Sequence, residues 1–305
     1  MAILVDPPRW PAHGTVWAHL VSDASLEELH AFARAAAVPP RAFDLDHYDV
    51  PVERVPELVA AGAEPVSGRE LLARLRRSGL RVRGADRPGE RARHRRDDLP
   101  RRWTSIPHEA DAATWDALGA SLLARWTEPH RRYHDDAHLT DVLEHLDVLA
   151  AAGATVTRAV VLAAWFHDAV YDGAPGADEE GSARLADAWL ADHLPADERA
   201  EVVRLVRLTA SHAPAADDAA GAALCDADLA ILAASPTRYR RYAAAVRAEY
   251  DHVPEPLFRA GRAEVLHALL AHDPLFATPQ GRSRWEDAAR RNVAAELVRL
   301  TGEPG

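Results

Sequence analysis

The chain has 305 residues, of which 48% are hydrophobic and 27% are charged, a composition typical of globular proteins rather than disordered or fibrous ones. Its net charge of −11 is uneven: residues 1–102 carry 17 arginines against 15 acidic residues, and residues 103–305 carry 19 against 32. This acidic excess argues against nucleic-acid binding through phosphate neutralisation. The single cysteine excludes an internal disulfide, and no apolar run approaches the ~20 residues that cross a bilayer, so we expect a cytoplasmic protein with no membrane partner.

Residues 1–83 have the pattern of a small α/β domain. The run AILVD and the alternating run RAFDLDHYDVP predict short strands. SLEELHAFARAAAV and SGRELLARLRRSGLRV carry apolar residues at helical spacing, with Ser25 as a candidate N-cap and Gly79 ending the second helix before a candidate strand. The first residues, MAILVDPPRW, lack a basic segment, so we predict no signal peptide.

Residues 84–102, GADRPGERARHRRDDLPRR, carry many charges without an apolar period, and we interpret them as a linker. From Trp103 onward nearly every segment has helical periodicity, which predicts an all-α bundle over residues 103–305 and a mainly α protein overall. The expected helices cover about 111–126, 137–152, 156–171, 178–193, 197–211, 219–233, 236–250, 257–271 and 283–300.

Three of these helical segments place histidine or aspartate among apolar residues. His134 and His138 lie four residues apart at the edge of an apolar stripe, His167 and Asp168 interrupt AVVLAAWFHDAVY, and two aspartates interrupt AALCDADLAIL. Burying an unpaired carboxylate costs several kcal/mol, so these side chains are unfavourable in a core unless they meet. Imidazole nitrogen and carboxylate oxygen are ligands of divalent cations, and the joint pattern predicts a metal site.

The order His, His-Asp, Asp resembles the HD superfamily of metal-dependent phosphohydrolases, which are all-α proteins, over about residues 105–300. YHDDAH is similar to the Tyr-His-Asn-x-x-His motif of cyclic nucleotide phosphodiesterases and related HD proteins, FHDAVYD carries the His-Asp doublet, and DADLAIL is similar to a closing Ala-Asp-x-Leu pattern. With DEEGSA, LTASH and RAEYDHV, these segments resemble an uncharacterised bacterial branch of predicted HD phosphohydrolases.

The resemblance implies roles for individual residues. The implied metal ligands are His138, His167, Asp168 and Asp228. Asp228 rather than Asp226 takes the last place, Asp168 also orients a water molecule, and His134 becomes the proton donor to the leaving group. Asp135 departs from the asparagine of the phosphodiesterase motif, which leaves its hydrogen-bonding role open.

The implied function is hydrolysis of a phosphate ester of a nucleotide or another small phosphorylated metabolite. The implied cofactor is a divalent ion, with Mn, Mg, Co, Ni, Zn and Fe all compatible; it would polarise the phosphoryl group and lower the pKa of water. Two alternatives stay open: a diiron oxygenase on the same ligand set, which needs about six protein ligands, and a non-catalytic metal or nucleotide sensor. A homo-oligomer is also compatible with the sequence.

Other polar residues are candidates for the surroundings of the metal. Candidates for a second metal ion, or for residues around the first, are Glu179, Glu180 and His212. Acids at a helix start and a histidine at a helix end also interact favourably with the helix dipole, which is their structural alternative. Candidate substrate contacts are Arg247, Arg259, Arg262, Tyr242 and Tyr250. The arginines suit bidentate phosphate binding but fit a solvated face equally well, and the tyrosines could stack on a base or simply pack.

Residues 1–83 resemble a small bacterial domain of unknown function (domain of unknown function 4031) through DPPRWPAHGTVWAHLVSD, FDLDHYDVP and GLRVR. The resemblance implies no activity. The candidate pocket residues of this segment are His13, Trp17, His19, His47 and Tyr48. Structural or surface roles in a small domain are their simpler interpretation.

Overall fold

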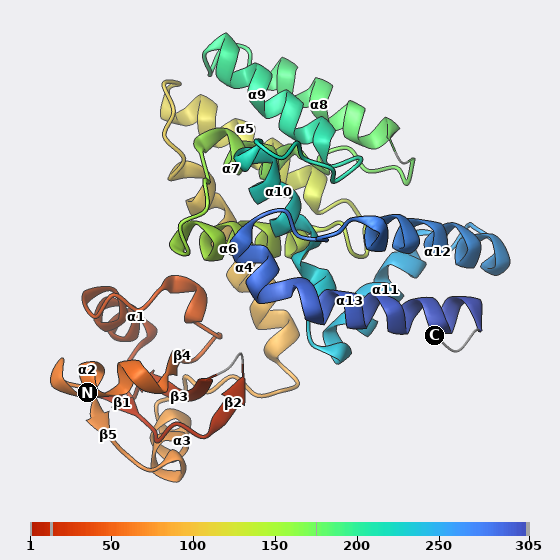
Figure 1. Cartoon of the computed structure of the whole chain (residues 1–305). Helices are drawn as coiled ribbons and strands as arrows, with labels where there is room; N and C mark the ends of the chain where they lie inside the picture. Colours follow the sequence, from red (N-terminus) through yellow and green to blue (C-terminus); the bar gives the residue numbers. More distant parts are fainter. Residues whose placement is uncertain (1, 13–14, 175, 303–305) are drawn as a thin grey trace. The chain divides into compact units, whose positions relative to one another are not determined.

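The computed structural model describes residues 2–12, 15–174 and 176–302, and it divides the chain into two compact units, Met1–Arg96 and Asp97–Gly305. The first is a small mixed α/β unit and the second is mostly helical (Figure 1), as the sequence predicts.

The N-terminal unit is built on a small sheet. Its strands are β1 (Ile3–Val5), β2 (Trp10–Ala12), β3 (Thr15–Ser22), β4 (Tyr48–Pro51) and β5 (Glu64–Pro65). β3 pairs antiparallel with β1, β2 and β4, whereas β1 and β5 are parallel. The register of β3 and β4 sets His19 directly opposite Asp49. The sheet therefore brings together two polar residues that are 30 positions apart in the sequence.

Helices α1 (Leu26–Ala35), α2 (Val55–Ala60) and α3 (Gly68–Arg77) complete this unit. Ser25 caps α1 as the sequence predicts, because its hydroxyl accepts the backbone N–H of Glu28. The candidate strand after Gly79 is absent among the described residues. There the backbone N–H of Val82 donates to a buried carboxylate, that of Asp46, rather than to a neighbouring strand.

The segment expected to be a linker, residues 84–102, is mostly helical. Helix α4 spans Arg87–Thr104, and only its C-terminal end carries buried apolar side chains, those of Leu99 and Trp103. A helix was not predicted here because the remaining positions are charged, so the apolar spacing that signals a helix is missing over most of its length; the boundary between the two units, after Arg96, falls within the segment. Arg102 nevertheless pairs with Asp98 one turn earlier, a contact that supports the helical conformation.

The helical unit continues from α4 through nine described helices. They are α5 (Ala112–Trp126), α6 (Asp136–Ala151), α7 (Arg158–Phe166), α8 (Ala177–Trp189), α9 (Ala196–Leu208), α10 (Ala219–Leu229), α11 (Pro236–Glu249), α12 (Glu255–Ala271) and α13 (Pro279–Thr301), with a 3-10 turn over Ala230–Ala233. α8 and α9 lie side by side, as do α12 and α13, and α6, α7 and α10 pack against one another (Figure 1).

One large apolar cluster forms the centre of the helical unit. Trp103, Trp115, Trp126 and Trp165 are all fully buried in it. Trp103 and Trp115 stack with ring centroids 4.5 Å apart. A second cluster joins α11, α12 and α13 around residues such as Tyr239 and Phe276. The large aromatic groups make the surroundings of α7 dense and rigid, which suits a precisely placed polar site.

Helix α7 is shorter than the sequence predicts. The apolar run indicated a helix over 156–171, but α7 ends at Phe166 and His167 is its C-cap. The chain turns here because the guanidinium of Arg131 binds the carbonyl oxygens of Asp168 and Ala169, at 2.7 and 3.3 Å. A tertiary contact therefore ends a helix that apolar periodicity alone would continue.

In the described part of the chain, no single helix is both long enough and apolar enough to cross a membrane. One pair, Ala219–Ala233 with Pro236–Glu249, meets that criterion only when joined across a bend of 107°.

Candidate metal centre

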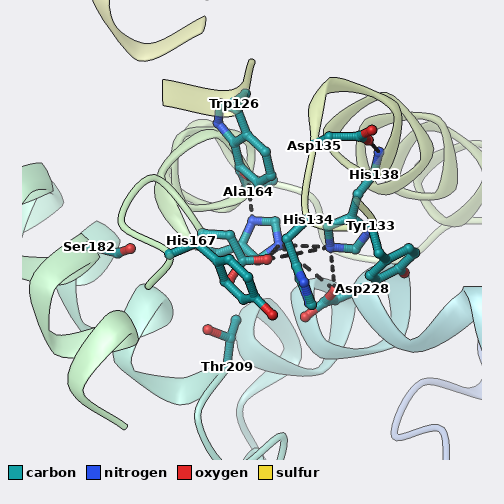
Figure 2. A network of polar contacts seen from close by, with 12 residues as sticks. Trp126, Tyr133, His134, Asp135, His138, Ala164, His167, Ser182, Thr209 and Asp228 are labelled. Carbon is teal, nitrogen blue, oxygen red and sulfur yellow. Dashed lines mark hydrogen bonds and ion pairs between the residues drawn. The ribbon is translucent and has the colours of Figure 1, made fainter. Parts of the chain in front are cut away.

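His138 enters the centre from the first turn of α6. Asp135 is the N-cap of this helix, and its carboxylate accepts the backbone N–H groups of Ala137 and His138. This capping gives Asp135, the position that departs from the phosphodiesterase motif, a defined structural role. The imidazole of His138 is buried and faces α7 and α10 (Figure 2).

His167 and Asp168 enter at the end of α7. Nδ1 of His167 lies 2.7 Å from the carbonyl oxygen of Ala164, one turn earlier. Because a carbonyl only accepts, Nδ1 carries a proton, and Nε2 is the nitrogen that faces the centre and is available to an ion. Asp168 follows directly, with its side chain 15% exposed.

The two aspartates of α10 point to different places. Oδ1 of Asp228 lies 3.1 Å from Nε2 of His138, and Asp228 belongs to the centre. Asp226 instead accepts hydrogen bonds from the backbone N–H of Ala277, at 2.7 Å, and from the N–H and hydroxyl of Thr278, at 2.8 and 2.6 Å. Asp226 therefore anchors the start of α13, and this placement agrees with the assignment of Asp228 to the metal.

The ligand atoms of the centre lie close to one another. Nε2 of His138 and Nε2 of His167 are 3.2 Å apart, and Oδ1 of Asp228 is 3.8 Å from Nε2 of His167 (Figure 2). Oδ2 of Asp168 lies 3.1 Å from Nε2 of His167 and 3.6 Å from Nε2 of His138. Two ring nitrogens at this distance repel each other unless a proton or a cation lies between them.

These distances suit a divalent cation. An ion that binds its ligands at about 2.1 Å separates neighbouring ligand atoms by about 3.0 Å in an octahedral site and about 3.4 Å in a tetrahedral one. The separations within the group of His138, His167 and Asp228, from 3.1 to 3.8 Å, lie in or just above this range. The donor set of imidazole and carboxylate groups therefore fits the implied metal.

The charges of the centre also favour a cation. Burial raises the pKa of Asp168 and Asp228, but the surrounding imidazoles, with His167 the largest contributor, together outweigh it and hold both pKa values below the usual range. Burial lowers the pKa of His167, whereas the two carboxylates raise it to about 9. Two ionised carboxylates beside two buried imidazoles create a negative potential that attracts positive charge.

His134 lies at the edge of the centre and is held by a residue that sequence reasoning missed. Its Nδ1 is 2.7 Å from Oε2 of Glu249, at the end of α11. The other oxygen of Glu249 accepts the backbone N–H of Arg132, Tyr133 and His134. The only sequence signal was the position of Glu249 in RAEYDHV, a segment to which the resemblance attached no role.

Tyr171 extends this arrangement. Its ring stacks on the imidazole of His134 with centroids 4.2 Å apart, and its hydroxyl donates to Glu249 Oε2 at 3.0 Å. Burial lowers the pKa of His134, but the hydrogen bond to Glu249 and the negative charges of Asp168, Glu249 and Asp228 together raise it above its usual value. His134 is thus a fixed imidazole with a carboxylate on Nδ1.

Arg131 is a second residue that sequence reasoning missed. Its side chain is fully buried, and it donates to the carbonyl oxygens of His134 and Asp168 at 2.8 and 2.7 Å. Its guanidinium also lies over the rings of Trp126 and Tyr171. This single group ties the segment before α6 to the end of α7, and so fixes the two segments that carry the histidines.

One of the three candidates for a second metal ion contacts the centre, and the other two have other partners. His212 Nε2 lies 2.8 Å from Oδ2 of Asp228, so His212 adjoins it. Glu179 accepts the backbone N–H of Gly176, and Glu180 forms a surface ion pair with Arg207. Both glutamates lie in the first turn of α8 and have structural roles there, which is the alternative to metal binding that their position in the sequence indicated.

The candidate substrate contacts are engaged within the protein. Arg247 binds Glu255 and two backbone carbonyls, and Arg259 binds the last carbonyls of α13. Arg262 binds Glu296 and the hydroxyl of Tyr242. Tyr242 also packs on Tyr133, with centroids 4.6 Å apart, and Tyr250 packs on His252 and Phe258. These contacts support structural roles for all five.

Among the candidate pocket residues of the N-terminal unit, some have structural contacts and others belong to a possible metal-binding group. His13 lies outside the described residues. The hydroxyl of Tyr48 is buried against His30 Nδ1 at 2.8 Å, and Trp17 pairs with Trp10 and Pro51 in the sheet. His19 and His47 lie together and form, with Asp49, a second His-His-Asp group.

Comparison with known protein families gives a match for part of the chain. Residues 3–78 match the family described as protein of unknown function (DUF4031). This match confirms the resemblance of the N-terminal segment. The helical remainder has no HD-domain match. No curated protein and no solved structure matches the chain.

Proposed function

We propose that the helical unit is a metal-dependent phosphohydrolase of the HD type, which cleaves a phosphate ester of a nucleotide or another small phosphorylated metabolite. The observation that carries this proposal is the convergence of His138, His167, Asp168 and Asp228 from the ends of α6, α7 and α10. The imidazoles are almost fully buried and the carboxylates are 13–15% exposed, so the carboxylate side is the one open to a substrate.

The protein residues have separate roles in this proposal. A bound divalent cation supplies Lewis acidity for the phosphoryl group and lowers the pKa of water. His138, His167, Asp168 and Asp228 would hold that cation, and Asp168 would also orient the water and accept its proton. Hydrolysis joins the water oxygen to phosphorus and breaks the bond between phosphorus and the alcohol oxygen, which leaves as an alkoxide.

His134 supplies the proton that the alkoxide needs. Glu249 occupies Nδ1 of the ring, so the proton transferred is the one on Nε2. The stacked ring of Tyr171 restricts rotation of the imidazole. This oriented proton donor favours an enzyme over a sensor, because binding alone does not require one.

The placement of the acidic side chains favours a hydrolase over a diiron oxygenase. A diiron centre needs about six protein ligands, and the sequence offered Glu179 and Glu180 for the second ion. Their carboxylates bind Gly176 and Arg207 instead, and among these candidates only His212 adjoins the centre.

Metal reconstitution followed by a phosphatase screen tests the proposal. Full-length protein would be stripped with a chelator, reloaded separately with Mn, Mg, Co, Ni, Zn or Fe(II), and assayed for phosphate release over nucleotides and sugar phosphates. We expect metal-dependent release that His138→Ala abolishes, whereas His267→Ala, on the exposed face of α12, retains wild-type activity. Metallated wild-type protein that releases no phosphate from any ester contradicts the proposal, and oxygen consumption with the iron form would identify the oxygenase.

A further inference from the structure

The sheet of the N-terminal unit gathers two histidines and an aspartate at one point. His19 on β3 is directly opposite Asp49 on β4. His47 precedes Asp49 by two positions, and because side chains alternate along extended chain, both project to the same side. The imidazoles of His19 and His47 lie with ring centroids 4.9 Å apart and meet edge to face.

The three side chains present ligand atoms to one another. Nε2 of His47 is 3.4 Å from Oδ1 of Asp49, and Nε2 of His19 is 3.9 Å from the same oxygen. The three ligand atoms all lie within 4.8 Å of one another. Neighbouring ligands of a tetrahedral ion bound at about 2.1 Å are about 3.4 Å apart, so small side-chain rotations suffice to close this group around one ion.

The other nitrogen of each imidazole is held by a carboxylate of its own. Nδ1 of His19 lies 3.1 Å from Oδ2 of Asp6, and Nδ1 of His47 lies 2.6 Å from Oδ1 of Asp46. A carboxylate on Nδ1 places the ring proton there and leaves the Nε2 lone pair for an ion, an arrangement that recurs around metal-binding histidines. Both Nε2 atoms then face Asp49.

The supporting carboxylates are themselves fixed. Asp46 is fully buried, and it also accepts the guanidinium of Arg81 at 3.0 Å and the backbone N–H of Val82 at 2.7 Å. Asp6 accepts the backbone N–H of His19 at 2.7 Å. A surface ion pair would need only one carboxylate for each imidazole, and here each ring already has one before Asp49 is added.

The group is open to solvent on one side. The side chain of Asp49 is 44% exposed and that of His19 is 24% exposed, whereas His47 is only 11% exposed. Three protein ligands with an exposed edge resemble catalytic and exchangeable metal sites more than closed structural ones, which use four. Two imidazoles with one carboxylate suit zinc, cobalt, nickel or iron, whereas magnesium and calcium prefer oxygen ligands.

We propose that the N-terminal unit binds one divalent transition-metal ion through His19, His47 and Asp49, with Asp6 and Asp46 orienting the two imidazoles. This site uses only residues of the N-terminal unit and does not depend on the function proposed for the helical unit. The site lies within residues 3–78, the segment that matches the family of unknown function.

Zinc stoichiometry and cobalt absorption of the full-length chain test the site. Chelator-stripped protein would be dialysed against zinc and analysed for metal per chain, for wild type, His47→Gln, His138→Ala and the double variant. We expect His47→Gln to lose one ion per chain relative to wild type, and the double variant to lose one relative to His138→Ala. If the helical centre binds no metal, His138→Ala matches wild type while His47→Gln still loses its ion, so failures of the two proposals are distinguishable.

Two further variants keep the result interpretable. Asp49→Asn alters an exposed side chain with little effect on the core, and should also lose the ion and the cobalt absorption assigned to this site. Asp6→Asn should weaken zinc binding about 10–100-fold, as removal of a carboxylate behind a metal-binding histidine does. His94→Gln, an exposed histidine of the same unit, is the matched control and should bind as wild type. Folded His47→Gln and Asp49→Asn proteins that retain wild-type stoichiometry would overturn the proposal.

Discussion

Nδ1 of His134 lies 2.7 Å from Oε2 of Glu249, a residue 115 positions further along the chain. The same carboxylate accepts three consecutive backbone N–H groups, those of residues 132–134. Burial by itself raises the pKa of Glu249, but the hydrogen bond from His134 and these backbone donors lower it to about 2. One ionised carboxylate therefore fixes both the imidazole and the segment that carries it.

Substitution of His134 should separate proton transfer from metal binding. His134→Ala should keep the metal, yet its rate on an alkyl phosphate should fall by about 10²–10⁴-fold, the usual contribution of acid–base catalysis. A p-nitrophenyl phosphate, whose leaving group needs little protonation, should be far less affected. Equal losses on both substrates with full metal occupancy would remove His134 from the acid role.

Glu249→Gln should slow proton transfer to the leaving group, but less than His134→Ala does. The amide keeps the size of the side chain but removes the negative charge on Nδ1, so the alkyl phosphate rate should fall by about 10–100-fold at unchanged metal occupancy. The ratio of alkyl to p-nitrophenyl rates is the informative measurement. An unchanged ratio would mean that Glu249 acts only on folding.

Replacement of each aspartate of α10 by asparagine should have a different effect, one on metal binding and the other on stability. Asp228→Asn should reduce metal occupancy strongly, because this side chain lies 3.1 Å from Nε2 of His138. Asp226→Asn should leave the metal in place but lower the free energy of unfolding by about 1–3 kcal/mol, since the amide cannot accept every hydrogen bond from residues 277–278. Elemental analysis and urea unfolding check the two effects, and the reverse ranking of occupancy would refute the assignment.

Gly119 lets the indole of Trp103 pack directly against α5. A Cβ atom at position 119 would lie 2.3 Å from Cδ1 of Trp103, which is buried and cannot move freely. Gly119→Ala should therefore lower the free energy of unfolding by about 1–3 kcal/mol, the usual cost of overpacking. A Cβ atom at Gly261 on α12 would have nothing within 4 Å, so Gly261→Ala should instead raise the free energy of unfolding by about 0.5–1 kcal/mol. Thermal or urea unfolding of the two variants measures both changes in stability and shows whether they have opposite signs.

Glu144 should make stability depend on pH near neutrality. Burial raises its pKa from 4.5 to about 7, Asp141 adds to the rise, and Arg102 and Arg238 oppose it. A carboxyl with a raised pKa binds a proton on folding, so its stabilising contribution is present below pH 4.5 and is lost as the pH rises through 7.

Glu144→Gln removes this titration. Its stability relative to wild type should be greater at pH 8 than at pH 5 by about 1–3 kcal/mol, because a pKa difference of one corresponds to about 1.4 kcal/mol. The exposed Glu264→Gln on α12 serves as the control for removal of one surface carboxyl group. A difference between Glu144→Gln and wild type that does not vary with pH would show that the carboxyl titrates normally in the folded protein.

The sequence by itself determined the order of the two units and most of the helices, because apolar periodicity and capping residues act within a few positions. Polar residues within apolar runs also indicated His138, His167 and Asp168 as members of a site, since such side chains are unfavourable in a core without partners. Where side chains are mostly charged, as in α4, the local signal was lost.

Only the tertiary structure decided which distant residues meet. Glu249 reaches His134 from the end of α11, Arg131 ends α7 by binding two carbonyls, and the register of β3 and β4 places His19 opposite Asp49. None of these contacts produces a periodic pattern in the amino-acid sequence. They depend on how helices and strands pack, and a shift of one residue in strand register would turn His19 to the other face of the sheet.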